Sequence, residues 1–246
     1  MKTKFSFLSI VFILIAGPGH TQVSGASVET SFQNYIRSSS GSVNTGTVLP
    51  NFLIKQDTKG NRYLYENWVE GSVTGVNGVV YNSPKYRYNY DKINRKLFML
   101  LDTTTIVELS SEDIAGFSLK TNGQVMVFER LKNSTDLNFY QAVYKNDKGY
   151  SLYKLLTTKF KKADFQTNGI IESGNKFDEY IDDQAYFILS PKQELIKISF
   201  KKKNIEKVLD NESSKVDTFF SQHKNEVLDE NFVKELLRYL NANSQS

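Results

Sequence analysis

Between residues 52 and 129 the chain repeats one pattern, a short run rich in Val, Ile, Tyr, Phe and Thr closed by a turn that contains Gly or Asn. This spacing is typical of antiparallel strands joined by hairpins. Asn-Gly pairs tolerate the positive φ that tight hairpin turns require. The pattern predicts strands over residues 52–55, 62–65, 69–74, 79–81, 86–90, 96–101, 105–109, 116–119 and 124–129.

Two further hairpins follow. Residues 138–144 and 150–156 form one, and residues 184–189 and 194–200 form the other. The segment from 159 to 178 between them has no clear period and is rich in lysine, which is typical of a sheet edge.

After residue 201 the apolar positions recur at helical spacing in three sets, each of which marks one face of a short helix. Ser213 or Ser214 is a suitable N-cap for the second helix, and Asp229 or Asn231 for the third. We therefore expect a mainly β (α+β) protein: an antiparallel β-meander, half-barrel or sandwich followed by a C-terminal cluster of short helices.

The N-terminus has the pattern of a secretory signal peptide, with Lys2 and Lys4 before the apolar run 5–16. That run is shorter than the roughly 20 residues that a membrane span needs. Small residues at Ser24 and Ala26 favour cleavage before Ser27, and a weaker candidate site follows Gly19, so cleavage is expected between Gly19 and Ser27. The expected organisation is a signal peptide (1–26), a short helix and flexible linker (27–47), an antiparallel β domain (48–200) and a helical segment packed on it (201–246).

The leader implies export to the periplasm, the outer membrane or the exterior, with no transmembrane segment after cleavage. The chain has no cysteine, which excludes disulfides and thiolate metal sites. It has 31 basic and 27 acidic side chains, and loss of the two leader lysines brings it close to neutrality. Nucleic acid is therefore not an expected partner.

Catalytic motifs are scarce. His223 is the one histidine beyond the leader region, so histidine-based nucleophile triads and zinc sites have almost no candidates. Neither the phosphate-binding loop nor the dinucleotide-binding glycine pattern occurs. We expect no catalytic residue, no metal ligand and no cofactor, and we favour a protein that is not an enzyme.

Charged clusters leave two alternatives open. The acidic stretch 178–183 could hold a calcium ion or supply glycosidase carboxylates, although a solvated acidic turn explains it more simply. Lysines at 159, 161, 162 and 201–203 could meet an anionic envelope glycolipid or phosphate, although solvated surface is the simpler interpretation.

Aromatic residues supply the candidate ligand-binding site. Tyr86, Tyr88 and Tyr90 alternate along one strand, so their phenols share one face, and Trp68 lies next to Tyr65 and Val69, just before the strand predicted over 69–74. Such rings could stack on a sugar. The competing interpretation is a half-buried strand whose rings make cross-strand pairs in the core.

The motif Asn-Trp-Val-Glu-Gly-Ser-Val at 67–73, the strand at 86–91 and the stretch 150–188 resemble an uncharacterised group of exported proteins from Bacteroidetes-type Gram-negative bacteria. The resemblance implies an envelope or secreted location and a β-rich body followed by Lys-rich short helices. It supplies no functional residues.

Three functions remain open. The first is a non-enzymatic module that binds an envelope glycan, lipid or protein through its sheet. The second is a carboxylate-dependent hydrolase of envelope polysaccharide. The third is a half-barrel carrier of an apolar ligand, because helices could cover one face of a long meander.

Overall fold

The structure is a computed structural model that describes residues 58–131, 136–169 and 171–243. Strands make up 42% of it and helices 18%, so the predicted mainly β class with C-terminal helices is confirmed. The signal peptide (1–26), the short helix and linker (27–47) and the strand predicted over 52–55 lie outside the described residues.

Fourteen strands are found in the described part of the chain. They are β1 (Thr58–Lys59), β2 (Glu70–Gly75), β3 (Val80–Asn82), β4 (Arg87–Asp91), β5 (Lys96–Leu100), β6 (Ile106–Glu108), β7 (Ile114–Thr121), β8 (Gln124–Glu129), β9 (Tyr140–Tyr144), β10 (Ser151–Lys161), β11 (Gln166–Thr167), β12 (Glu172–Ser173), β13 (Asp178–Leu189) and β14 (Leu195–Ile198).

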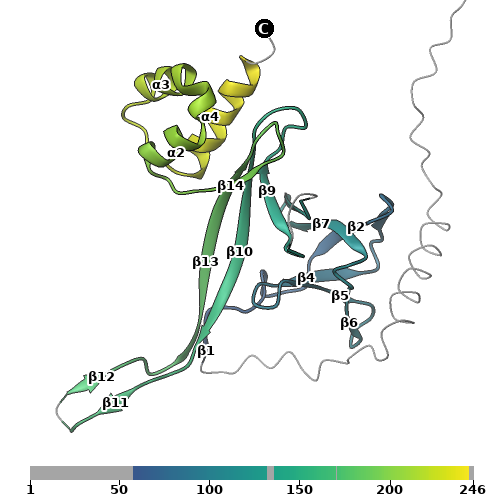
Figure 1. The fold of residues 1–246 in the computed structure, drawn as a ribbon. Helices are drawn as coiled ribbons and strands as arrows, with labels where there is room; N and C mark the ends of the chain where they lie inside the picture. The colour runs from purple at the N-terminus through teal and green to yellow at the C-terminus, as the bar shows by residue number, and fades with distance from the viewer. Residues whose placement is uncertain (1–57, 132–135, 170, 244–246) are drawn as a thin grey trace, which may run out of the picture.

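The larger sheet has the order β1-β13-β10-β9-β8-β7-β2-β3, and β14 also pairs with β13. Its pairs are antiparallel except β1–β13, which is parallel, so the purely antiparallel prediction is wrong at this edge. A smaller sheet has the order β4-β5-β6. We call the paired strands β10 and β13 the ribbon (Figure 1).

The helices α2 (Lys202–Val208), α3 (Ser213–Gln222) and α4 (Glu230–Ala242) form what we call the helical cap. Asp229 caps α4 by accepting a bond from the Phe232 amide, as predicted. The predicted serine cap of α3 is wrong: Glu212 occupies the N-cap position, because a 3₁₀ turn precedes the helix.

Two hydrophobic cores result. The first lies between the small sheet and strands β2, β3, β7 and β8, and Tyr88, Met99 and Phe117 belong to it. The second lies beneath the helical cap, where Leu152 and Ile188 of the ribbon meet the apolar faces of α2, α3 and α4. The ribbon contributes to both cores and joins the two parts of the molecule (Figure 1).

One predicted strand is replaced by irregular chain. Residues 62–65 run beside β4 but make only an isolated bridge at Tyr63. The Asn89 side chain donates to Tyr65 O (2.8 Å) and accepts from Tyr65 N (3.2 Å). The Asn89 side-chain amide therefore replaces a backbone partner. Both the N–H and the C=O of Tyr65 are hydrogen-bonded although no regular strand ladder forms here.

Candidate functional site

The three alternating tyrosines lie in the first core. Tyr86 is 1% exposed, and Tyr88 and Tyr90 are 0% exposed. The Tyr90 ring lies 5.4 Å from that of Phe117 and 5.5 Å from that of Phe128. Because all three rings are buried in the first core, they present no surface on which a sugar could stack, and the core interpretation accounts for their position.

Trp68 is half-buried in the segment that leads into β2. Backbone bonds between Val69 and Tyr88 hold this segment beside β4. The structure thus brings Trp68 near the tyrosine strand but does not form an accessible row of rings with it. A ligand-binding role for these four residues stays a prediction and requires the core to open.

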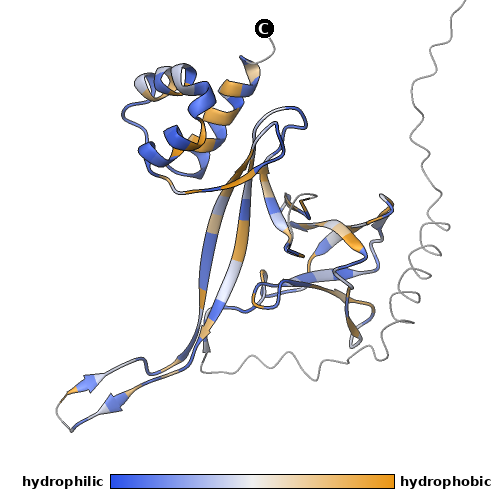
Figure 2. Ribbon diagram, in the orientation of Figure 1, coloured by the Kyte–Doolittle hydropathy of each residue, from blue (hydrophilic) through white to orange (hydrophobic). Residues whose placement is uncertain are grey.

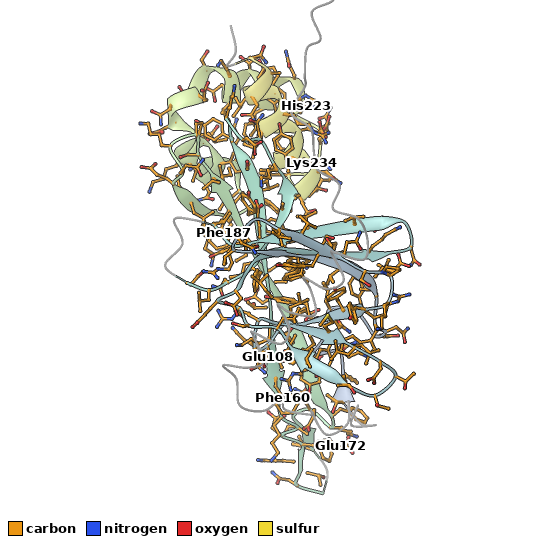
Figure 3. All side chains as sticks on the ribbon, turned by 90° about the vertical axis from the view of Figure 1, so that its right-hand side faces the viewer. Glu108, Phe160, Glu172, Phe187, His223 and Lys234 are labelled. Carbon is orange, nitrogen blue, oxygen red and sulfur yellow. The ribbon has the colours of Figure 1, made fainter. Side chains whose placement is uncertain are left out.

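His223 ends α3, where its amide donates to Phe219 O. Its ring stacks on Phe219 at 4.1 Å, and Nδ1 lies 2.7 Å from Glu226 Oε1. The ring also faces Phe232 of α4 edge-on at 6.2 Å, so His223 packs between two helices of the cap, with Glu226 as its polar neighbour. Figure 3 shows His223 at the end of the molecule that the helical cap forms.

The acidic stretch 178–183 is not the solvated turn that we predicted, because it forms the first half of β13. Asp178 accepts from the Ala163 amide at 2.8 Å, and Asp182 accepts from Lys92. Their carboxylates therefore serve as structural acceptors. Within residues 58–131, 136–169 and 171–243, no group of three or more His, Cys, Asp or Glu side chains is arranged to hold a metal.

The most distinctive surface is the far end of the ribbon, which we call the arm (residues 159–181). It contains the end of β10, the small hairpin β11–β12 and the start of β13, and it extends away from the helical cap (Figure 1). In Figure 3, Phe160 and Glu172 lie at the opposite end of the molecule from His223 and Lys234.

The arm exposes large apolar side chains. It carries five of the twelve exposed large hydrophobic residues in the described chain, including all three exposed phenylalanines. Strands β11 and β12 are themselves hydrophilic (Figure 2), so the apolar residues lie beside and between them. They are Phe160, Phe165, Ile171, Phe177 and Ile181, exposed by 37% to 69%.

Lysines accompany these rings. Lys176 Nζ lies 4.7 Å from the centre of the Phe165 ring, and Lys59 Nζ lies 4.9 Å from that of Phe177. Both positions are within the range of cation–π attraction. Lysines 159, 161 and 162 are exposed and have no ion-pair partner within 4.0 Å in the part of the chain that the structure describes.

The base of the arm is fixed to the rest of the molecule. Asp182 binds Lys92 at 2.6 and 2.7 Å and accepts a bond from the Thr158 hydroxyl across the ribbon. Close by, Asp91 is fully buried and accepts from Arg62 at 2.5 and 2.9 Å. The Lys92–Asp182 bonds hold the ribbon against the β4–β5 turn, and the Arg62–Asp91 bonds hold the neighbouring segment on β4, so the base of the arm is joined to a fixed scaffold.

The helical cap is joined to the same ribbon by a second polar contact. Glu230 Oε2 accepts from Lys154 Nζ and from the Tyr186 hydroxyl, each at 2.8 Å. Burial, the hydrogen bond to Glu230 and its charge together raise the pKa of Tyr186, so this phenol stays protonated as a donor.

Comparisons of the chain with protein-family models, with curated proteins and with solved structures found no match. The resemblance to exported Bacteroidetes-type proteins therefore stays a prediction. No helix in the described ranges is long and apolar enough to cross a membrane.

Proposed function

We propose that the chain is an exported, non-enzymatic binding protein of the cell envelope or exterior, and that the arm is the element that contacts its partner. The observation that carries the proposal is the concentration of exposed Phe and Ile side chains on one protruding hairpin. Exposed apolar groups that gather in one place are characteristic of interaction sites, because water is displaced from them on binding.

The anchoring of the arm supports this role. A contact element that is already held in place loses little conformational entropy when it binds. The bonds of Asp182 to Lys92 and Thr158 hold the base of the arm, while its tip stays exposed. The leader pattern supports the envelope or extracellular location.

Binding to isolated cell envelopes tests the proposal. The variant F160S/F165S/F177S removes three exposed rings without touching either core, so its urea unfolding midpoint should match the unchanged protein. We expect its retention on sedimented envelopes to fall by at least about tenfold, since apolar contacts carry the affinity.

The matched control is V125S/V127S, which removes two exposed valines from β8, outside the arm. This variant should bind like the unchanged protein. Equal retention of the arm variant and the control contradicts the proposal. The proposal is also contradicted if the arm variant unfolds, because the three rings then stabilise the fold instead of contacting a partner.

A further inference from the structure

We infer that the partner of the arm is an anionic lipid bilayer, whose interface the arm tip enters. This inference rests on the proposed function, since it names the partner of the same site. It is drawn from the distribution of apolar groups around the arm, from the lysines beside them and from the position of the arm in the molecule.

Apolar side chains lie on both faces of the ribbon. In the β10–β13 register Phe160 is opposite Tyr180, and Lys159 is opposite Ile181. Successive residues of a strand point to opposite faces, so Phe160 and Ile181 lie on different sides of the arm. A folded protein partner docked on one side covers only one of them. A fluid bilayer interface surrounds a hairpin that enters it and covers both.

The arm carries lysines without ion-pair partners. Residues 159–181 hold four lysines and four acids, and Lys161 lies opposite Glu179 in the β10–β13 register. Glu172 pairs with Lys176 at 2.6 Å, whereas Asp164 and Asp178 accept from backbone amides. Lys159, Lys161 and Lys162 are exposed and have no ion-pair partner within 4.0 Å among the described residues, so their ammonium groups are available to an anionic surface.

Lysine and phenylalanine side by side match the two layers of a bilayer interface. The aromatic rings enter the boundary between headgroups and acyl chains, while the flexible lysine stems let the ammonium groups reach lipid phosphates. Each lysine near an anionic membrane surface adds a similar amount to the binding free energy. The contributions of Lys159, Lys161 and Lys162, which have no ion-pair partner among the described residues, therefore add up.

The overall shape favours this mode of contact. The arm points away from the helical cap, and the apolar faces of α3 and α4 are buried in the second core (Figure 1). The tip can therefore enter a membrane surface while the body and the cap stay outside it. No unfolding of either core is required.

Flotation with lipid vesicles tests the inference, using the full chain so that residues outside the arm contribute equally to every variant. Vesicles of phosphatidylcholine alone are compared with vesicles that also contain phosphatidylglycerol. We expect binding to the second kind only. The variant K159Q/K161Q/K162Q should weaken it by about 100-fold, and added salt should weaken it further because exposed charges are screened.

Single variants distinguish a bilayer from a one-sided partner. F160S and I181S remove apolar groups from opposite faces, and both should weaken vesicle binding, whereas V125S/V127S should not. If only one of the two weakens it, the contact is one-sided and the inference fails. It also fails if all arm variants float like the unchanged protein.

The same variants separate this inference from the proposed function. If envelope retention depends on the arm but phosphatidylglycerol vesicles are not bound, the arm is a binding element for a glycan or protein and the lipid inference is wrong. If the arm instead drives concentration-dependent self-association in sedimentation velocity, abolished by F160S/F165S/F177S, its occupant is a second copy and the lipid inference is again wrong.

Discussion

Lys92 Nζ lies 2.6 Å from Asp182 Oδ1, and this ion pair joins the β4–β5 turn to the base of the arm. The two partners differ in environment: the Lys92 side chain is 7% exposed and that of Asp182 is 56% exposed. An unpaired charge is costly where water cannot reach it. Removal of the aspartate should therefore be more harmful than removal of the lysine.

We expect D182A to lower the free energy of unfolding by about 2 kcal/mol, because it leaves a buried ammonium without a counter-charge. K92M should cost less than about 1 kcal/mol, since methionine fills the space of the lysine stem and Asp182 stays hydrated. Urea titrations at neutral pH measure both. If K92M proves the more destabilising of the two, the pair does not act as described.

Glu230 should make the junction between helical cap and ribbon sensitive to acid. Burial acts to raise its pKa, but hydrogen bonds from Lys154 and Tyr186 and the charge of Lys154 outweigh burial, so the pKa lies below its ordinary value of 4.5. A carboxyl whose folded pKa is lowered stabilises the fold above its unfolded pKa. That contribution is lost as the pH falls through the folded pKa.

The unchanged protein should therefore lose stability relative to E230Q as the pH falls below about 4.5, and the difference should be constant at neutral pH. Thermal unfolding of both proteins across this range measures it. If the spectroscopic signal of the helices is lost at low pH while that of the β-sheet is retained, the effect of Glu230 is located at the helical cap. A difference that does not change with pH argues against the assigned role of Glu230.

Asn241 fastens the end of α4 to the β9–β10 hairpin. Its Oδ1 accepts from Tyr150 N and its Nδ2 donates to Tyr150 O, both at 2.8 Å. We expect N241A to cost about 2 kcal/mol, because both backbone groups of Tyr150 lose their partner in a buried place. A Cβ added at Gly149 would collide with Asn241 Oδ1, so G149A should also destabilise the fold.

The two substitutions should not be additive. In the N241A background the obstructing oxygen is gone, so G149A should cost at least about 1 kcal/mol less than it does alone. A double-mutant cycle by urea unfolding gives this coupling. If the two losses of unfolding free energy are additive, G149A destabilises the fold through the backbone of the turn and not through its contact with Asn241.

The hydroxyls of Tyr88 and Tyr90 are buried without a hydrogen-bond partner in the described part of the chain. Burial raises the pKa of both phenols, so they stay neutral. A buried hydroxyl without a partner is a net cost. We therefore expect Y88F and Y90F to be neutral or to stabilise the fold by up to about 1 kcal/mol in chemical unfolding. A clear loss of stability indicates that a bound molecule satisfies the hydroxyl.

Local patterns predicted the regular strands well. Strand β8 was predicted with its observed bounds, Gln124–Glu129, because the Asn122-Gly123 turn before it supplies two consecutive positive φ values. Strands of this kind are specified by alternation and turn chemistry within a few residues. The helices after residue 201 were predicted for the same reason, since a repeating apolar face is a local signal.

Distant contacts explain what the sequence could not show. Four acids in six residues disfavour a strand, yet residues 178–183 pair with β10 and are held by Lys92, which lies far away in the chain. Likewise, the alternation of Tyr86, Tyr88 and Tyr90 indicates a shared face but not whether that face is covered. At Tyr90 the cover includes Phe117 and Phe128, which come from later strands.

The apolar residues of the arm were missed because no helical or strand period joins them. The sequence signal that could have indicated the arm is a short hairpin: the polar pairs Gln166-Thr167 and Glu172-Ser173 flank Asn168-Gly169. Gly169 has the positive φ that favours a turn at this point. That hairpin gathers Phe165, Ile171 and Phe177 at one end of the molecule.

The parallel pairing of Thr58 with Asp178 sets an order of assembly. These residues are roughly 120 positions apart in the chain, and such remote pairs form late because a long loop must close first. During synthesis, β1 has nowhere to dock until β13 has emerged. The seam between β1 and β13 therefore closes only after most of the β region has been made.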